Sequence, residues 1–197
     1  MKKLALLALL ATVAVGTAGA QQLDAAFGVT TVTSPELSTA TAEHFPQRLG
    51  GGAYPAFSAN YLWPNHLGFG GEVAFRAKSN LYTGFQPYRP ILFSFNAVYA
   101  PPIGTRFQPE INAGIGMQSV RFYTPFFECD FTGCTNYQSS NHFLTKVGGG
   151  LRFYVSEKIF VRPEAHAYFV RNNLEFSSPR VLRYGLSIGY TLRTEEP

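Results

Sequence analysis

The fold of this chain is decided by the stretch Phe69-Gly70-Gly71-Glu72-Val73-Ala74-Phe75-Arg76-Ala77-Lys78. Every second residue, from Phe69 to Ala77, is apolar or small, whereas Glu72, Arg76 and Lys78 all occupy the other register. A period of two places successive side chains on opposite faces of a β-strand. The stretch therefore predicts a strand with one uncharged face and one face that carries all of its charges.

The same alternation recurs along the rest of the chain. Strand patterns and turn residues define eight segments at residues 23–33, 52–63, 68–78, 91–100, 106–120, 142–155, 159–170 and 181–194. Each is about ten residues or longer, which is enough to cross a hydrocarbon layer at a tilt. Long connections (34–51, 79–90, 121–141, 171–180) alternate with short ones (64–67, 101–105, 156–158). This alternation is typical of membrane-spanning barrels with short periplasmic turns and long external loops.

Periodicity alone does not say which face of the barrel points inward. A soluble lipocalin-like ligand carrier has the same alternation with its apolar face inside. Here the polar register is rich in glycine, which suits a crowded interior: Gly28, Gly70, Gly114, Gly116, Gly148, Gly150, Gly185 and Gly189. Aromatic residues near the short turns resemble an interfacial girdle: Tyr61, Trp63, Tyr99, Phe153 and Tyr190. We therefore predict an all-β, eight-stranded antiparallel up-and-down transmembrane β-barrel, with lipid against the apolar face.

Composition and the amino terminus agree with this prediction. Lys2 and Lys3 precede a short apolar run, and Ala18-Gly19-Ala20 is a small-residue cleavage pattern, so residues 1–20 are predicted to be a signal peptide. Residues 21–197 would then form one barrel domain. Charged residues are 14% of the chain, against roughly 25% in soluble domains. No later apolar run reaches the length of a membrane-spanning helix, and the charge pattern does not suggest nucleic acid as a partner.

The inward register is predicted to hold a network of charged side chains. Its expected members are Glu72, Arg76, Lys78, Arg106, Glu110, Lys146, Arg152, Arg162, Glu164, His166 and Arg183. The interior of an eight-stranded barrel is just wide enough for side chains to fill, and buried ions must be paired. We interpret the network as structural filling, with a narrow pore as the alternative. His166, beside Glu164 and Tyr168, is interpreted as a packed polar histidine rather than an acid or base.

The longest predicted loop carries two features. Cys129 and Cys134 are expected to form a disulfide, because two cysteines and a distant histidine fall short of a metal site. Around them lies an unusual density of aromatic residues for a solvated loop: Phe122, Tyr123, Phe126, Phe127, Phe131 and Tyr137. Exposed apolar patches often mark interaction surfaces. Contact with a partner or with lipopolysaccharide is one hypothesis, and packing of these rings on one another is the other.

In its export pattern, strand number and alternating loops, the chain resembles the small outer-membrane β-barrel superfamily that includes the OmpA transmembrane domain and the OmpX-type proteins. The resemblance spans residues 23–194 and is one of pattern rather than of a motif. It implies a monomeric outer-membrane protein, inserted by the barrel assembly machinery and surrounded by outer-membrane lipid and lipopolysaccharide. A structural or surface-interaction role is the expected function.

Catalytic motifs are mostly absent. There is no Gly-x-Ser-x-Gly or His-Glu-x-x-His pattern, and Gly148-Gly149-Gly150 lies within a strand, with no helix after it. Lipid A modifying barrels resemble this chain in size, and their deacylases use a His-x-Ser-Asn pattern. His166-Ala167-Tyr168-Phe169 lacks the serine, and Ser139-Ser140-Asn141-His142 has the residue types in another order. The sequence therefore predicts no enzyme, catalytic residue, metal or cofactor, with a lipid A modifying enzyme as an alternative.

Overall fold

A computed structural model describes residues 22–35, 47–130, 133–173 and 175–193. The predicted signal peptide and Phe131 lie outside these ranges. Within them the chain forms nine strands: β1 (Gln22–Thr33), β2 (Tyr54–Leu62), β3 (Leu67–Phe75), β4 (Asn80–Tyr82), β5 (Gln86–Tyr99), β6 (Phe107–Asp130), β7 (Gly133–Tyr154), β8 (Ile159–Val170) and β9 (Arg180–Arg193). None of the described segments is a helix long and apolar enough to cross a membrane.

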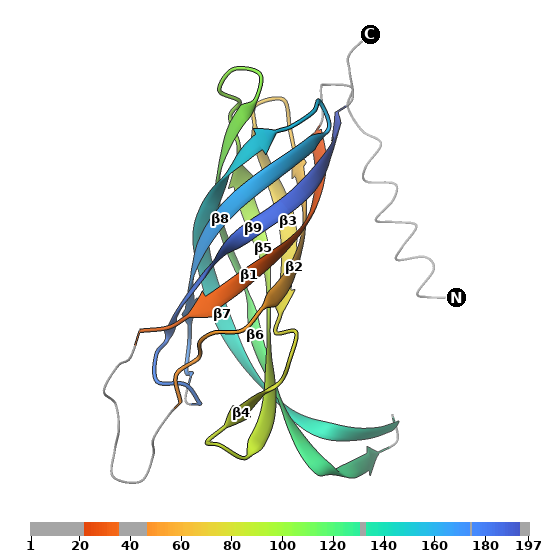
Figure 1. The fold of residues 1–197 in the computed structure, drawn as a ribbon, viewed down its shortest axis with the longest axis vertical. Coiled ribbons are helices and arrows are strands. Elements are labelled where there is room, and N and C mark those ends of the chain that lie inside the picture. The colour runs from red at the N-terminus through yellow and green to blue at the C-terminus, as the bar shows by residue number, and fades with distance from the viewer. Residues whose placement is uncertain (1–21, 36–46, 131–132, 174, 194–197) are drawn as a thin grey trace.

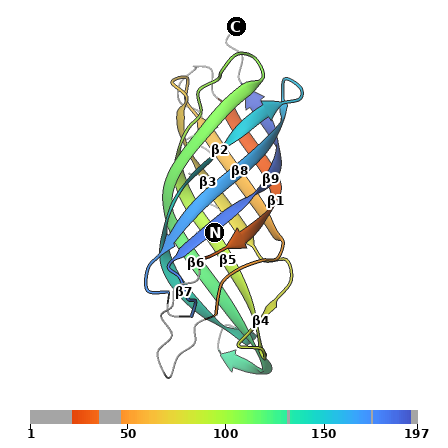
Figure 2. The same ribbon diagram turned by 60° about the vertical axis from the view of Figure 1, so that its left-hand side comes forward.

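Eight of the strands close into a barrel (Figures 1 and 2). Neighbours along the chain pair antiparallel, β9 pairs with β1, and β3 pairs with β5 to complete the ring. The short strand β4 pairs only with the start of β5 and stands outside the ring. A closed ring leaves no unpaired edge within the wall. The predicted eight-stranded antiparallel up-and-down barrel is confirmed.

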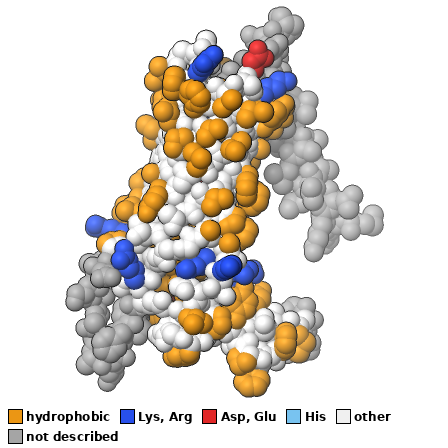
Figure 3. Space-filling model, in the orientation of Figure 1, with side chains coloured by type: hydrophobic (Ala, Val, Ile, Leu, Met, Phe, Trp, Pro, Cys, Tyr) orange, Lys and Arg blue, Asp and Glu red, His pale blue; other side chains and the backbone are white. Residues whose placement is uncertain are grey.

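Side chains alternate between lumen and exterior along every strand of the ring. In β1, Asp24 and Thr30 are buried, whereas Leu23, Phe27 and Val29 are about half exposed. The exterior is apolar on the other strands as well, with Phe95 at 72% and Ile111 at 67% exposure. Figure 3 shows apolar side chains spread over the barrel wall. The polar register therefore faces inward, as predicted. A lipocalin-like barrel would need the apolar register inward, which is the opposite of what the structure shows.

The two ends of the barrel differ as predicted. At one end are the tight turns, where the Trp63 amide donates to the Leu67 carbonyl and the Val155 amide to the Ile159 carbonyl. The start of β1 and the end of β9 pair at that same end. At the other end, drawn at the bottom of Figure 1, are the long connections and β4. We refer to these as the turn end and the loop end.

Two of the predicted loops are largely strand. Residues 121–141 were expected to form a loop, but β6 and β7 continue past the barrel as a two-stranded arm. Their ladder runs through Tyr123 and Tyr137, shifts register, and resumes at Glu128 and Thr135. Residues 79–90 were also expected to be a loop, yet they contain β4 and the start of β5. Backbone hydrogen bonding between strands replaces solvation of the main chain in both places.

The lumen at the loop end is filled by an apolar cluster that we call the mouth cluster. Its buried members are Val32, Leu49, Tyr54, Tyr88, Leu92, Val120, Leu144, Tyr168, Val170, Phe176 and Val181. Phe176 comes from the connection between β8 and β9 and is 3% exposed. Its ring lies 5.6 Å from that of Tyr88 on β5, across the barrel from its own hairpin. The connection between β8 and β9 thus folds over the mouth and closes it.

Candidate functional site

The middle of the lumen holds a continuous row of ion pairs, which we call the ion-pair chain. Carboxylates and cations alternate in the order Asp24, Arg152, Glu110, Arg162, Glu164, Arg183, Glu72 and Lys146. The separations include 2.6 Å from Arg152 Nη2 to Glu110 Oε2 and 2.7 Å from Arg183 Nη2 to Glu72 Oε2. Formal charges of opposite sign are equal in number along the row. Each buried ion is therefore compensated, as a low-dielectric interior requires.

Hydrogen bonds satisfy many of the polar atoms in the lumen that the ion pairs leave without a partner. Asn112 donates to Glu110 Oε1, and the Ser187 hydroxyl lies 3.2 Å from Glu164 Oε2. The Tyr168 hydroxyl donates to Glu72 Oε1 at 2.9 Å. On the turn-end side of the row, the Tyr154 hydroxyl donates to Gln108 Oε1 at 2.7 Å. The lumen is thus layered, with polar amides and hydroxyls beside a small apolar cluster of Leu62, Val98 and Ala100 at the turn end, ions in the middle and the mouth cluster at the loop end.

The structure corrects the predicted network in two places. Lys78 and Arg106 are exposed rather than inward, because β3 ends at Phe75 and β6 begins at Phe107. The alternation was extended past the hydrogen-bonded ladder, where it no longer fixes side-chain direction. Arg76 does point inward, but its guanidinium lies 6.0 Å from the centre of the Tyr88 ring, on the loop-end side of the ion-pair chain.

One member of the ion-pair chain, Asp24, was missing from the predicted set. It is 2% exposed, pairs with Arg152 and accepts a hydrogen bond from Thr191 at 2.7 Å. The sequence contained the necessary information, because Asp24 shares the register of Gly28 in the first strand. Asp24 is the only charged residue of that predicted segment, so no repeating pattern of charge indicated an ion pair there.

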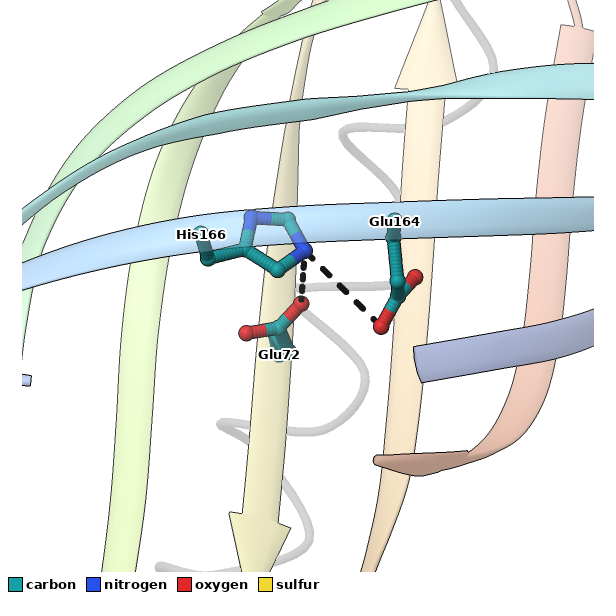
Figure 4. Close-up of side chains that lie close together, drawn as sticks. All are labelled: Glu72, Glu164 and His166. Carbon is teal, nitrogen blue, oxygen red and sulfur yellow. Dashed lines mark ion pairs between the residues drawn. The ribbon is translucent and has the colours of Figure 1, made fainter. Parts of the chain in front are cut away.

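His166 lies between two carboxylates of the ion-pair chain (Figure 4). Its Nε2 atom is 3.8 Å from both Glu72 and Glu164, and the three side chains could in principle surround a metal ion. However, Arg183 Nη2 already lies within 3.3 Å of both carboxylates. A divalent cation would have to displace this guanidinium and would add charge to a balanced row. The arrangement therefore fits a structural polar layer better than a metal site.

A second polar group lies at the mouth, where Ser140 and His142 on β7 meet Glu175 from the β8–β9 connection. His142 Nε2 is 2.8 Å from Glu175 Oε2 and 3.0 Å from the Ser140 hydroxyl, which also donates to Glu175. Burial of Glu175 would raise its pKa, but hydrogen bonds from Ser140 and His142 outweigh burial and lower that pKa. His142 uses the same nitrogen, Nε2, to contact both Ser140 and Glu175, whereas the histidine of a catalytic triad contacts its two partners through opposite ring nitrogens. The group fastens the connection to β7.

The aromatic residues of the predicted loop divide into two sets. Phe122 points inward and packs against the mouth cluster, with its ring 5.3 Å from that of Tyr82. Beyond the barrel, the arm formed by residues 123–130 and 133–137 carries Tyr123 and Tyr137 in contact at 6.0 Å. Phe126 and Phe127 are 77% and 69% exposed. The Cys129–Cys134 disulfide links the two strands of this arm near its tip.

Comparisons with known proteins agree with this architecture. A family model described as outer membrane protein beta-barrel domain matches residues 4–191. One similar solved structure is neisserial surface protein A, with a TM-score of 0.61 and 12% identity over 88% of this chain and 99% of that one. Another is the Yersinia pestis attachment invasion locus protein Ail, with a TM-score of 0.58 and 14% identity over 87% of this chain and 99% of that one. A third is the N-terminal barrel of Pseudomonas aeruginosa OprF, with a TM-score of 0.55 and 13% identity over 87% of this chain and 97% of that one. Comparison with curated protein sequences finds no match.

Proposed function

Because this chain belongs to the outer membrane protein beta-barrel domain family, we propose that it is a non-conducting, non-enzymatic outer-membrane barrel that presents the arm at the cell surface. The observation that carries this proposal is the arm itself, which extends β6 and β7 beyond the barrel at the loop end (Figure 1). Long connections of outer-membrane barrels face the outside of the cell. The arm is therefore placed where it can contact molecules beyond the membrane.

A filled lumen supports the non-conducting part of the proposal. Arg152 and Arg183 are fully buried in the ion-pair chain, and Phe176 seals the mouth. An ion entering this lumen would have to break ion pairs in a low-dielectric interior, where leaving one charge uncompensated costs several kcal/mol. The expected electrical property is the absence of stable single-channel steps.

The composition of the arm supports a role in contact. Phe126 and Phe127 expose large apolar rings on a two-stranded segment that a disulfide constrains. Apolar side chains held in a restrained conformation lose little entropy on binding. The proposed role is therefore attachment to a partner outside the cell, and the partner's identity is left to the experiment below.

Processing and assembly follow from the same proposal. We infer that residues 1–20 are removed on export and that the barrel assembly machinery inserts the mature chain. Pairing of β3 with β5 leaves no open edge within the barrel wall for a second copy, which supports a monomer. Ser140, His142 and Glu175 are proposed to act in docking the β8–β9 connection and not in lipid A chemistry.

Planar-bilayer recording and site-specific crosslinking test the proposal together. Refolded protein is expected to give no stable steps under conditions in which a general porin conducts, and stable steps would contradict a filled lumen. A photoreactive benzophenone amino acid at position 126 is expected to crosslink on intact cells to a macromolecule other than lipid. The control at position 95, on the barrel wall and 72% exposed, should label lipid only. Identical lipid-only labelling at both positions would reject the contact role.

Mass spectrometry of lipid A tests the non-enzymatic part separately. Lipid A from cells that express the wild-type chain and from cells that express the Ser140→Ala variant is expected to carry the same acyl chains as lipid A from cells without the protein. A change in acylation that requires Ser140 would overturn this part and leave the contact role untouched.

A further inference from the structure

Arginines end the apolar exterior of the barrel at the loop end. Arg89 on β5, Arg121 on β6, Arg180 on β9 and Arg171, just after β8, all occupy the outward register. In β8 and β9, the neighbouring outward residues Phe169 and Leu182 are 44% and 47% exposed. Figure 3 shows a row of Lys and Arg side chains across the molecule between the apolar wall and the loop end, with no acidic side chain among them on that face. We call the four arginines the basic collar.

Two members of the basic collar face each other directly. Arg89 and Arg121 are partners in the β5–β6 register, so their Cβ atoms lie about 5 Å apart. Like charges at such a pair destabilise a sheet. Among the described residues, neither Arg89 nor Arg121 forms an ion pair with a carboxylate, because every ion pair there uses a different cation. Arg121 lies 4.8 Å from the centre of the Tyr137 ring, and Arg89 Nε is buried without a hydrogen-bond partner.

We propose that Arg89 and Arg121 together bind the phosphate of an outer-leaflet lipid headgroup. A phosphate offers several acceptor oxygens that match the planar donor fork of a guanidinium, and its negative charge would remove the repulsion between the pair.

The wall beside the pair favours a lipid over a free anion. Phe95 and Ile115 are partners in the same β5–β6 register, on the same outward face and nearer the middle of the barrel. They are 72% and 57% exposed. A phosphate held at Arg89 and Arg121 would place attached acyl chains along these side chains, in the hydrocarbon layer that surrounds the wall. Arginines at the edge of a membrane can also extend their charged ends toward water without binding a ligand. That behaviour would explain where the basic collar lies, but not why Arg89 and Arg121 face each other directly.

Native mass spectrometry tests the site with purified mature protein in alkyl glucoside micelles, which contain no phosphate. The probes are phosphatidic acid and the diacylglycerol with the same acyl chains. Wild-type protein is expected to retain phosphatidic acid about tenfold better than the diacylglycerol. The Arg89→Gln/Arg121→Gln variant is expected to retain the two lipids equally. The matched control, Arg106→Gln/Lys158→Gln, removes two exposed charges at the turn end and should keep it.

Two results would overturn the assignment. One is equal retention of phosphatidic acid by the collar variant and the control variant. The other is displacement of bound phosphatidic acid by an equal concentration of inorganic phosphate, which would mark a free-anion site instead.

A single substitution gives a second readout that does not depend on the double variant folding. In alkyl glucoside, Arg121→Gln relieves repulsion and is expected to raise the melting temperature relative to wild type. With phosphatidic acid present it removes a ligand contact, so its melting temperature should fall below that of wild type. A variant less stable in both conditions would count against the site. The inference rests on the proposed outer-membrane orientation but uses neither conductance nor the arm, so the two proposals can fail independently.

Discussion

Inward charges in this barrel are stabilised by sharing partners. Arg152, which is fully buried, contacts Asp24 on one side and Glu110 on the other, with Arg152 Nε 2.8 Å from Glu110 Oε2. Its guanidinium also lies 5.3 Å from the centre of the Phe160 ring. A planar group with several donors suits this bridging position better than the single ammonium of lysine. Glycine at nearby inward positions makes room, because a Cβ at Gly150 would lie 2.9 Å from Arg162 Cγ.

Replacing Arg152 by alanine is expected to lower the free energy of unfolding by about 3 to 5 kcal/mol, because two buried carboxylates lose their shared cation. Urea unfolding in lipid vesicles, followed by the fluorescence of Trp63, measures this loss. The matched control is Arg106→Ala, since Arg106 is an exposed arginine just before β6, the strand next to the one that carries Arg152. It should stay within about 0.5 kcal/mol of wild type. Equal effects of the two substitutions would show that the ion-pair chain contributes little.

At the scale of elements, the β8–β9 connection acts as a lid over the barrel. Phe176 supplies the apolar part of its docking and Glu175 the polar part. The Tyr82 hydroxyl donates to the Glu175 carbonyl at 2.7 Å, which ties β4 to the same connection. Three segments distant in sequence thus meet at the mouth, and their side chains close it.

Docking of this connection is expected to depend on pH through Glu175. The folded contacts lower the pKa of this carboxyl, so its stabilising effect is complete above the ordinary carboxyl pKa of about 4.3. The effect is lost as pH falls through the lowered value. Hydrogen exchange of the amides of residues 175–178, corrected for intrinsic rates, should accelerate more at acidic pH than that of the barrel strands.

Glu175→Gln should remove most of the pH dependence of this exchange. Glu157→Gln, which changes an exposed carboxylate at the turn end, should leave it intact. Unchanged protection of the connection in acid would show that the Phe176 contacts alone hold it down.

The whole molecule resembles a soluble protein turned inside out. In the middle of the barrel its ions lie in the lumen and its large apolar side chains lie outside, where Ile111 and Leu186 are 67% and 52% exposed. In water this surface would be a strong aggregation hazard. In a bilayer it is the stable arrangement, since one arginine or lysine on the lipid face at the midplane would cost about 2 to 4 kcal/mol.

Fluorescent labels attached to single cysteines at Val73, Ile111 and Leu186 should report the lipid around the barrel. We expect quenching by brominated acyl chains and little quenching by aqueous iodide. A label at Glu157, in an exposed turn, should give the opposite pattern. Iodide quenching at the three wall positions would contradict the membrane orientation.

Much of the architecture could be predicted because β-structure and burial leave a local trace in sequence. The alternation in Phe69 to Phe75 fixed both the strand and the direction of its side chains, and the scarcity of charge identified the exterior. The inward placement of Glu110, Arg162 and Arg183 followed from register alone. The predicted inward placement was wrong for Lys78 and Arg106, because alternation has meaning only within a hydrogen-bonded ladder.

The sequence by itself determined the class of barrel, the positions of its wall strands and which register faces lipid, because these depend on the period of two and on desolvation of charge. Only the tertiary structure decided which ions pair, since Asp24 and Arg152 belong to strands that meet across the lumen. It also decided that residues 123–130 and 133–137 form an arm and that Phe176 seals the mouth. These features depend on strand register and on packing between distant segments, which no local pattern specifies.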